Sequence, residues 1–218
     1  MRTVMNEPKH TFRNLPADKR ERILQAAVEE FASQGYKKAS INSIVKKVGI
    51  AKGSLYQYFA NKEALFFYIF EQFTILVKRL VKDATAGDDS LDIFRRIGRI
   101  LEAGTWFIDK YPEYFRIYQK VLFEHDVPGR EFLLSRIRLF PAEYFAPLCD
   151  EAKKQGVVNS EISTSMVIFL VDAVIDKFLQ AYAGSYLDTG LGLADMTRKE
   201  RAESINEVIG ILQKGIGA

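Results

Sequence analysis

A glycine between two short segments with apolar faces constrains this chain more than any other feature. The stretch 48–65 reads VGIAKGSLYQYFANKEAL. Gly49 suits a tight turn, because glycine tolerates the backbone angles that end one helix and begin the next. Ser40 is expected to cap a helix over 41–47, and a second short helix is expected over 51–58. Two helices joined by a short glycine turn form a helix-turn-helix, whose second helix fits the major groove of DNA.

The predicted second helix separates an apolar face from a polar one. Leu55 and Phe59 are four residues apart and share the face that anchors inward. The outward positions are expected to carry a cation, small residues, two phenols and an amide, namely Lys52, Gly53, Ser54, Tyr56, Gln57 and Tyr58. Such groups contact phosphates and base edges, and they supply neither a nucleophile with its base nor a metal shell. The pattern therefore favours nucleic-acid binding over catalysis.

Three runs of residues around this turn carry a family resemblance. They are FASQGY at 31–36, ASINSIV at 39–45 and the stretch 48–65. Over about residues 17–66 the chain resembles the DNA-binding domain of the tetracycline-repressor (TetR) family. The rest of the chain is compatible in length and helical pattern but carries no family signature. The resemblance implies an all-α fold, in which an N-terminal three-helix helix-turn-helix head joins a larger C-terminal helical bundle.

The resemblance also implies which residues meet DNA. It places Lys52 and Gly53 at bases or the adjoining backbone, Ser54, Tyr58 and Lys62 at phosphates, and Tyr56 and Gln57 near the groove. The chemistry agrees, because a lysine ammonium attracts phosphate and glutamine pairs bidentately with adenine. Ser40, at a helix N-terminus, is a further phosphate candidate. Ala51 departs from the serine or threonine frequent in the family, which removes one phosphate contact and a cap worth roughly 1 kcal/mol. Core packing of the tyrosines and a solvated Lys62 are the alternatives.

Positive charge is concentrated in the same part of the chain. The 218 residues carry a net charge of +3. Residues 1–60 hold eleven Lys/Arg and five Asp/Glu, whereas 61–218 hold twenty and twenty-three. A basic head on a near-neutral body is typical of a nucleic-acid-binding protein, although basic N-terminal segments are common elsewhere. We predict a flexible N-terminal arm at 1–14, a helix-turn-helix DNA-binding domain at 15–60, and a ligand-binding and dimerisation domain at 61–218.

Helical periodicity continues to the end of the chain. After the helix-turn-helix we expect helices from Lys62 to about residue 84, over 91–110, in a short aromatic segment after Pro112, and over 131–155, 161–183 and 198–212. Pro141 and Pro147 are expected to kink or break the fourth of these. No strand is predicted.

Aromatic residues at helical spacing fill the C-terminal part, which most often indicates a packed core. The resemblance instead implies an apolar ligand cavity there. The candidate lining residues are Trp106, Tyr114, Tyr118 and Phe169. A scarcity of obvious buried charge suits a small, largely apolar effector, such as an acyl chain or another lipophilic compound.

Apolar stripes on the last two long helices form a second candidate surface. Two-fold DNA sites mirror two-fold proteins, so a helix-turn-helix protein usually needs a partner copy. The resemblance places the homodimer interface on these helices, with Met166, Ala173, Val174, Ile205, Val208, Ile209 and Leu212 as candidates. Core packing is the alternative. The expected nucleic-acid partner is a palindromic operator in double-stranded DNA.

Other chemistry has little support in the sequence. His125 stands beside Asp126, but the only other histidine, His10, lies in the predicted arm, so a metal site would lack ligands. Cys149 is the only cysteine, which excludes an internal disulfide and suits a reducing cytoplasm; packing is the expected role of its thiol, with redox sensing as the alternative. Neither a bilayer-length apolar run nor a signal core is present. We predict a cytoplasmic protein without cofactor, metal, catalytic residues or membrane partner.

These observations together predict a ligand-responsive transcriptional regulator, in which a small apolar ligand releases a repressor from its operator. A ligand-binding or interaction module without sequence-specific DNA binding is the first alternative. The second is an α-helical enzyme acting on a lipophilic substrate, for which the sequence offers no acid-base or nucleophile constellation.

Overall fold

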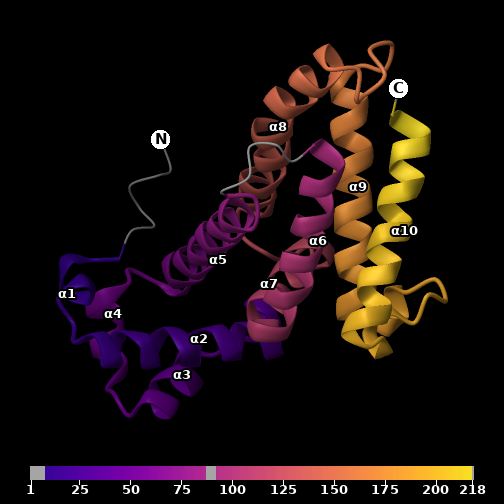
Figure 1. Cartoon of the computed structure of the whole chain (residues 1–218). Coiled ribbons are helices and arrows are strands. Elements are labelled where there is room, and N and C mark those ends of the chain that lie inside the picture. Colours follow the sequence, from indigo (N-terminus) through magenta and orange to yellow (C-terminus); the bar gives the residue numbers. More distant parts are fainter. Residues whose placement is uncertain (1–7, 87–91, 218) are drawn as a thin grey trace. The chain divides into compact units, whose positions relative to one another are not determined.

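The computed structural model describes residues 8–86 and 92–217, and it shows a helical protein (Figure 1). In chain order the helices are α1 (His10–Arg13), α2 (Ala17–Lys38), α3 (Ile41–Val48), α4 (Lys52–Tyr58), α5 (Lys62–Ala84), α6 (Ile93–Lys110), α7 (Pro112–Phe123), α8 (Arg130–Lys154), α9 (Thr164–Ala183) and α10 (Arg198–Ile216). Two 3₁₀ turns, η2 (Ser185–Leu187) and η3 (Leu193–Asp195), lie between α9 and α10. Across the described ranges, extended pairing is limited to an isolated bridge between Val158 and Gly217. The predicted all-α fold is confirmed.

Contacts divide the chain into two compact units. The head unit contains the residues up to Leu76 together with Tyr111–Arg136, and the body unit contains Val77–Lys110 and the residues from Ile137 onward. The head unit thus combines the helix-turn-helix with the first part of α5, with α7 and with the start of α8. The functional boundary expected at residue 60 is a separate matter and stays a prediction.

The core of the head unit forms where α2 packs on α3 and α7. Ile23 and Phe31 of α2 are fully buried, as are Leu65 and Ile69 of α5. The ring of Phe31 meets that of Phe66 edge-on, with centroids 5.0 Å apart. Each fully buried side chain of this size contributes roughly 1.5–3 kcal/mol, so the core holds the short helices of the head in place.

The body unit is built around the apolar faces of α6, α9 and α10. Ile97 and Leu101 of α6 are fully buried and belong to one cluster with Val167 and Val171 of α9. Hydrogen-bonding side chains define the starts of the two last helices. Ser163 accepts from the Met166 amide, and Thr197 forms a reciprocal capping box with Glu200 that lowers the pKa of the Glu200 carboxyl.

Three details of the helices differ from the sequence predictions. Residues 8–14 of the predicted arm include the short helix α1, whereas residues 1–7 lie outside the described residues, and the arm itself stays a prediction. Helix α8 runs through Pro141 and Pro147 without the break that was one of two expected outcomes. Helix α10 continues four residues past the predicted end, because Ile216 as well as Leu212 is buried in the body core.

Candidate nucleic-acid interface

The first helix of the helix-turn-helix, α3, begins at the predicted residue and ends one residue after the predicted end. The Ser40 side chain accepts a hydrogen bond from the Ser43 amide at 3.4 Å. Gly49 adopts the left-handed conformation, with φ 77° and ψ 38°, and its amide donates to the Val45 carbonyl. Ile44 and Val48 are buried on the inner face. Both predicted caps are therefore confirmed.

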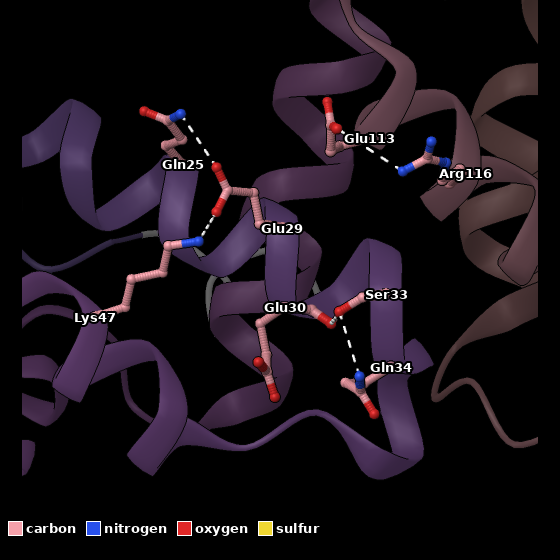
Figure 2. Close-up of polar contacts among 8 residues, drawn as sticks. All are labelled: Gln25, Glu29, Glu30, Ser33, Gln34, Lys47, Glu113 and Arg116. Carbon is pink, nitrogen blue, oxygen red and sulfur yellow. Dashed lines mark hydrogen bonds and ion pairs between the residues drawn. The ribbon is translucent and has the colours of Figure 1, made fainter.

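Polar side chains of α2 form hydrogen bonds with α3 and with Ser40, the residue before it. Figure 2 shows Glu29 of α2 between Gln25 and Lys47, and both donate to its carboxylate. Glu30, drawn nearby in the same view, accepts from the Ser40 amide at 2.8 Å. These polar contacts join the two helices outside their shared apolar core. Lys47 is thereby paired with a carboxylate, which makes it a weaker candidate for phosphate contact.

The second helix, α4, presents one polar face to solvent. Lys52, Gly53, Tyr56 and Gln57 are exposed, and Ser54 is half-buried. Successive residues of a helix advance by 100°, so the four exposed positions lie within an arc of about 140°. Apart from its chain neighbours and the backbone of its own helix, no atom of the described residues lies within 4 Å of the position that a Gly53 Cβ would occupy. A backbone that open to solvent can approach a flat partner closely.

The opposite face of α4 is buried, and Tyr58 belongs to it. Leu55 is 1% exposed and Tyr58 is 7% exposed. The expectation that Tyr58 points outward is therefore wrong, because a residue three positions after Leu55 lies only about 60° from it on the helix. Phe12 covers the Tyr58 ring, with centroids 5.9 Å apart. A phosphate contact from the Tyr58 hydroxyl stays a prediction.

The two lysines predicted to meet DNA lie in different environments. Within the described part of the chain, Lys52 makes no hydrogen bond, ion pair or ring contact. The Lys62 ammonium instead donates to the carbonyls at the end of α2, at 2.8 Å to Tyr36, 3.3 Å to Lys37 and 3.1 Å to Ala39. It also lies 4.6 Å from the centroid of the Tyr36 ring. Lys62 thus closes the C-terminus of α2, where a cation is favourable to the helix dipole.

The predicted ligand residues fall into both units. Tyr114 and Tyr118 of α7 lie against Phe73 of α5, with ring centroids 6.4 and 5.8 Å from it. Burial raises the pKa of the Tyr114 hydroxyl. Trp106 and Phe169 belong to the body unit and are 49% and 65% exposed. A cavity of about 320 Å³ in the head unit is lined by other residues, among them Arg13, Arg20 and Tyr68.

The predicted dimer residues differ in how exposed their side chains are. Met166 and Ala173 of α9 are exposed, and Val174 is half-buried. On α10, Val208 and Ile209 are half-buried, whereas Ile205 and Leu212 lie in the body core. Ile205 therefore fills the intramolecular core, which was the alternative interpretation of the α10 stripe. Ile211, which the sequence prediction omitted, is 64% exposed on the same helix.

The remaining candidates are structural. Cys149 is fully buried, and burial raises the pKa of its thiol to about 11, which disfavours the reactive thiolate. Asp126 pairs with Lys37 at 2.7 Å, and this hydrogen bond holds the pKa of the carboxyl below its usual value.

Among the described residues, no cluster of three or more His, Cys, Asp or Glu could hold a metal. None of the helices in the same ranges is long and apolar enough to cross a membrane.

Comparison with known proteins identifies the family. The profile described as bacterial regulatory proteins, tetR family, matches residues 23–69, from α2 into α5. The Bacillus subtilis (strain 168) transcriptional regulator YvdT is 42% identical over 161 residues, which cover 73% of this chain and 82% of YvdT. The chain belongs to the TetR family of transcriptional regulators. It is accordingly a DNA-binding regulator with a helix-turn-helix head.

Other known proteins match over different lengths. YdgC of Bacillus subtilis (strain 168) is 33% identical over 95 residues, and the matched part spans 49% of that protein. A TetR-family regulator from Chloroflexus aurantiacus J-10-FL superposes with a TM-score of 0.74 at 29% identity, covering 97% of this chain and 99% of that one. FadR from Bacillus subtilis, solved in complex with stearoyl-CoA, superposes with a TM-score of 0.70 at 18% identity, covering 90% and 98%. This last likeness shows the fold.

Sequence reasoning missed the residues that hold α4 from outside the helix-turn-helix. Lys9 and Thr11 donate to carbonyls of α4, and Phe12 packs beneath it. Phe12 stands alone in a polar segment, so no periodic pattern marked it as buried. The one available signal was the aromatic residue itself, because a large ring in a short polar segment must find a partner to leave water.

Proposed function

We propose that α4 is the recognition helix and that its exposed face reads DNA in the major groove. The observation that carries this proposal is the polarity of α4: Lys52, Gly53, Tyr56 and Gln57 face solvent, while Leu55 anchors the opposite side. A lysine with no partner among the described residues suits a phosphate or a guanine edge, and an exposed glutamine suits adenine. Ser40 and Ser54 are further phosphate candidates, whereas Lys62 is occupied by backbone carbonyls.

We further propose that the protein binds a palindromic operator as a homodimer. A two-fold DNA site places two recognition helices roughly 34 Å apart, in successive major grooves. Exposed apolar residues on α9 and α10, including Met166, Ala173 and Ile211, support a partner surface there. Ile205 and Leu212 would act indirectly, by holding α10 on the body core.

The effector in this proposal is a small, largely apolar molecule. The aromatic pair Tyr114 and Tyr118, stacked on Phe73, offers an apolar surface with two hydroxyl groups. FadR, a protein of the same fold, was solved with stearoyl-CoA, which supports an acyl compound as the first class to test. The ligand would release a repressor from DNA only if it binds more tightly to the conformation that does not bind DNA.

We assign no catalytic activity, and we place the protein in the cytoplasm with its DNA target.

The test is selection of bound sequences from random duplex DNA by the full-length protein. We expect enrichment of one palindrome by the wild type. Lys52→Ala and Tyr56→Ala should each abolish or strongly weaken that enrichment. Lys199→Ala is the matched control, because it removes one exposed lysine from α10 in the body unit. An effector screen with acyl compounds on the recovered operator would follow.

Two outcomes would contradict the proposal. If folded wild-type protein enriches no sequence at low salt, the module without sequence-specific DNA binding becomes the better interpretation. If a palindrome is enriched equally by Lys52→Ala, Tyr56→Ala and Lys199→Ala, another surface reads the DNA. Enrichment of a single half-site would contradict the two-fold arrangement alone.

A further inference from the structure

The C-terminus of α4 lacks the features that usually end a helix. The helix has only seven residues, and Phe59 rather than glycine follows it. The Phe59 amide donates to the Leu55 carbonyl at 2.9 Å, which is the last bond of the helical ladder. The carbonyls of Tyr56, Gln57 and Tyr58 therefore need partners from outside the helix. Short helices are marginal without tertiary support, so these partners matter for the shape of α4.

Residues 9–12, which we call the cap segment, supply those partners. The Lys9 ammonium donates to the Tyr56 carbonyl at 2.8 Å, and the Thr11 hydroxyl donates to the Gln57 carbonyl at 2.6 Å. The Lys9 amide donates to the Tyr58 carbonyl at 2.9 Å. All three terminal carbonyls are thus satisfied by two residues that are distant in sequence. The Lys9 charge also lies at the end of the helix where the dipole favours a cation.

An apolar anchor holds the cap segment in place. Phe12 is 0% exposed, and its ring centroid lies 4.7 Å from that of Phe59 and 5.9 Å from that of Tyr58. It also meets the ring of Tyr68 edge-on at 5.7 Å. Tyr68 belongs to α5, so the cap segment is fixed to the helix after α4 as well as to α4 itself. Movement of α4 relative to α5 would have to displace this ring.

We propose that residues 9–12 position the recognition helix for DNA binding. The inference rests on the proposed role of α4, and it makes Lys9, Thr11 and Phe12 positioning residues rather than DNA contacts. A recognition helix must hold its side chains within about half an ångström of the productive geometry, and this requires rigid support. The cap segment provides that support where the sequence of α4 does not. Although Lys9 is charged, its ammonium bonds the Tyr56 carbonyl of the protein itself.

The experiment compares single substitutions in the full-length chain. Thr11→Val keeps the shape of the side chain and removes one donor, and we expect it to weaken operator binding roughly three- to tenfold. Phe12→Ala removes the anchor, and we expect a loss of more than about tenfold. His10→Ala is the matched control, since His10 lies in α1 and its ring bonds Asn14 rather than α4. Operator affinity is read by fluorescence anisotropy on the selected palindrome.

The salt dependence separates positioning from direct contact. Each phosphate contact contributes a slope of about −0.9 to the logarithm of affinity against the logarithm of salt concentration. We expect Thr11→Val and Lys9→Met to weaken binding with the slope of the wild type. A slope reduced by about one unit in Lys9→Met would overturn the positioning role of Lys9 and assign it to a phosphate. Thr11→Ser, which restores the donor, should recover the affinity.

Hydrogen exchange tests the inference without DNA. We expect the Phe59 amide to exchange faster in Thr11→Val than in the wild type, while the Gly49 amide at the end of α3 is unchanged. Equal exchange of Phe59 in the two proteins would overturn the inference. This readout keeps the two proposals distinct: a wild type that binds no duplex contradicts the function of α4, and the exchange data still decide whether residues 9–12 cap it.

Discussion

The two helices of the helix-turn-helix are stabilised in different ways. α3 has a side-chain cap from Ser40 at its start and a left-handed glycine, Gly49, at its end. α4 has Ala51 at its start, with no side-chain cap, and Phe59 at its end. α3 thus carries its own boundary residues. α4 depends on residues 9–12, which precede it by at least forty positions.

This difference corresponds to different tasks. α3 supports the head from within, through buried Ile44 and Val48 and through contacts with α2. α4 must leave one face free for a partner, so only Leu55 and its neighbours on one side can be buried. A seven-residue helix with one free face has few intrahelical means of stability. An external cap provides stability without occupying the exposed face.

The largest effect is expected when the anchor of α4 is removed. Phe12→Ala should lower the free energy of unfolding by about 3–5 kcal/mol, because a fully buried ring is replaced by a cavity. Urea denaturation measures the change. Phe123→Ala is the matched control, since Phe123 is 55% exposed at the end of α7. Equal and small effects for both variants would contradict the role of Phe12.

Replacing glycine by alanine should change the free energy of unfolding in opposite directions at Gly49 and Gly53. Gly49→Ala forces a side chain into the left-handed region and should cost about 1–2 kcal/mol. Gly53→Ala, in the first turn of α4, should raise stability by up to about 1 kcal/mol, because alanine favours a helix and the site is open. The same Gly53→Ala should weaken DNA binding if the backbone approaches the duplex. Thermal melts and anisotropy measure the two effects, and a stabilised variant with full affinity would remove Gly53 from the interface.

The intrinsic N-cap of α3 should contribute about 1 kcal/mol. Ser40→Ala removes the acceptor for the Ser43 amide, and caps of this kind are worth about that amount. Ser33→Ala on the exposed side of α2 is the control, because the Ser33 hydroxyl donates a hydrogen bond to the Glu30 carbonyl within the same helix. Chemical denaturation of both variants measures the difference. No loss in Ser40→Ala would mean that Glu30 and the α2 contacts define the start of α3.

The smallest effect is expected from supplying α4 with the cap that it lacks. Ala51 has extended backbone angles, φ −68° and ψ 144°, which suit an N-cap residue. Ala51→Ser should therefore stabilise the head by roughly 0.5 kcal/mol, the lower end of the range for such caps. A shift in the denaturation midpoint measures it. Destabilisation would indicate that the start of α4 is already optimised for another contact.

The sequence predicted the parts of the fold whose signals are local. The caps Ser40 and Gly49 and the extent of α5 follow from neighbouring residues, and the structure confirms them. The burial of Tyr58 could have been derived from its spacing to Leu55. The family resemblance depended on residues 31–65, where the motif is dense.

Non-local contacts could not be predicted in the same way. Lys62 carries the same charge as Lys52, and only the position of the α2 carbonyls shows that Lys62 is occupied, whereas Lys52 has no partner among the described residues. Phe12 has no periodic neighbours, so its burial depends on a pocket made by α4 and α5. The stripe on α10 looked uniform, yet packing on α6 places Ile205 in the core and leaves Ile211 exposed.

The most direct test of the central claim, that α4 reads DNA bases, is the base preference of Gln57→Ala. Its side chain is exposed, and the Thr11 bond uses only the Gln57 carbonyl, so truncation leaves the cap in place. Selection from random duplexes by Gln57→Ala should recover the wild-type palindrome with a relaxed base preference at one position in each half-site. At that position the binding free energy of the preferred base should fall by about 1–3 kcal/mol. A palindrome unchanged at every position would contradict the assignment of α4 as the base-reading helix.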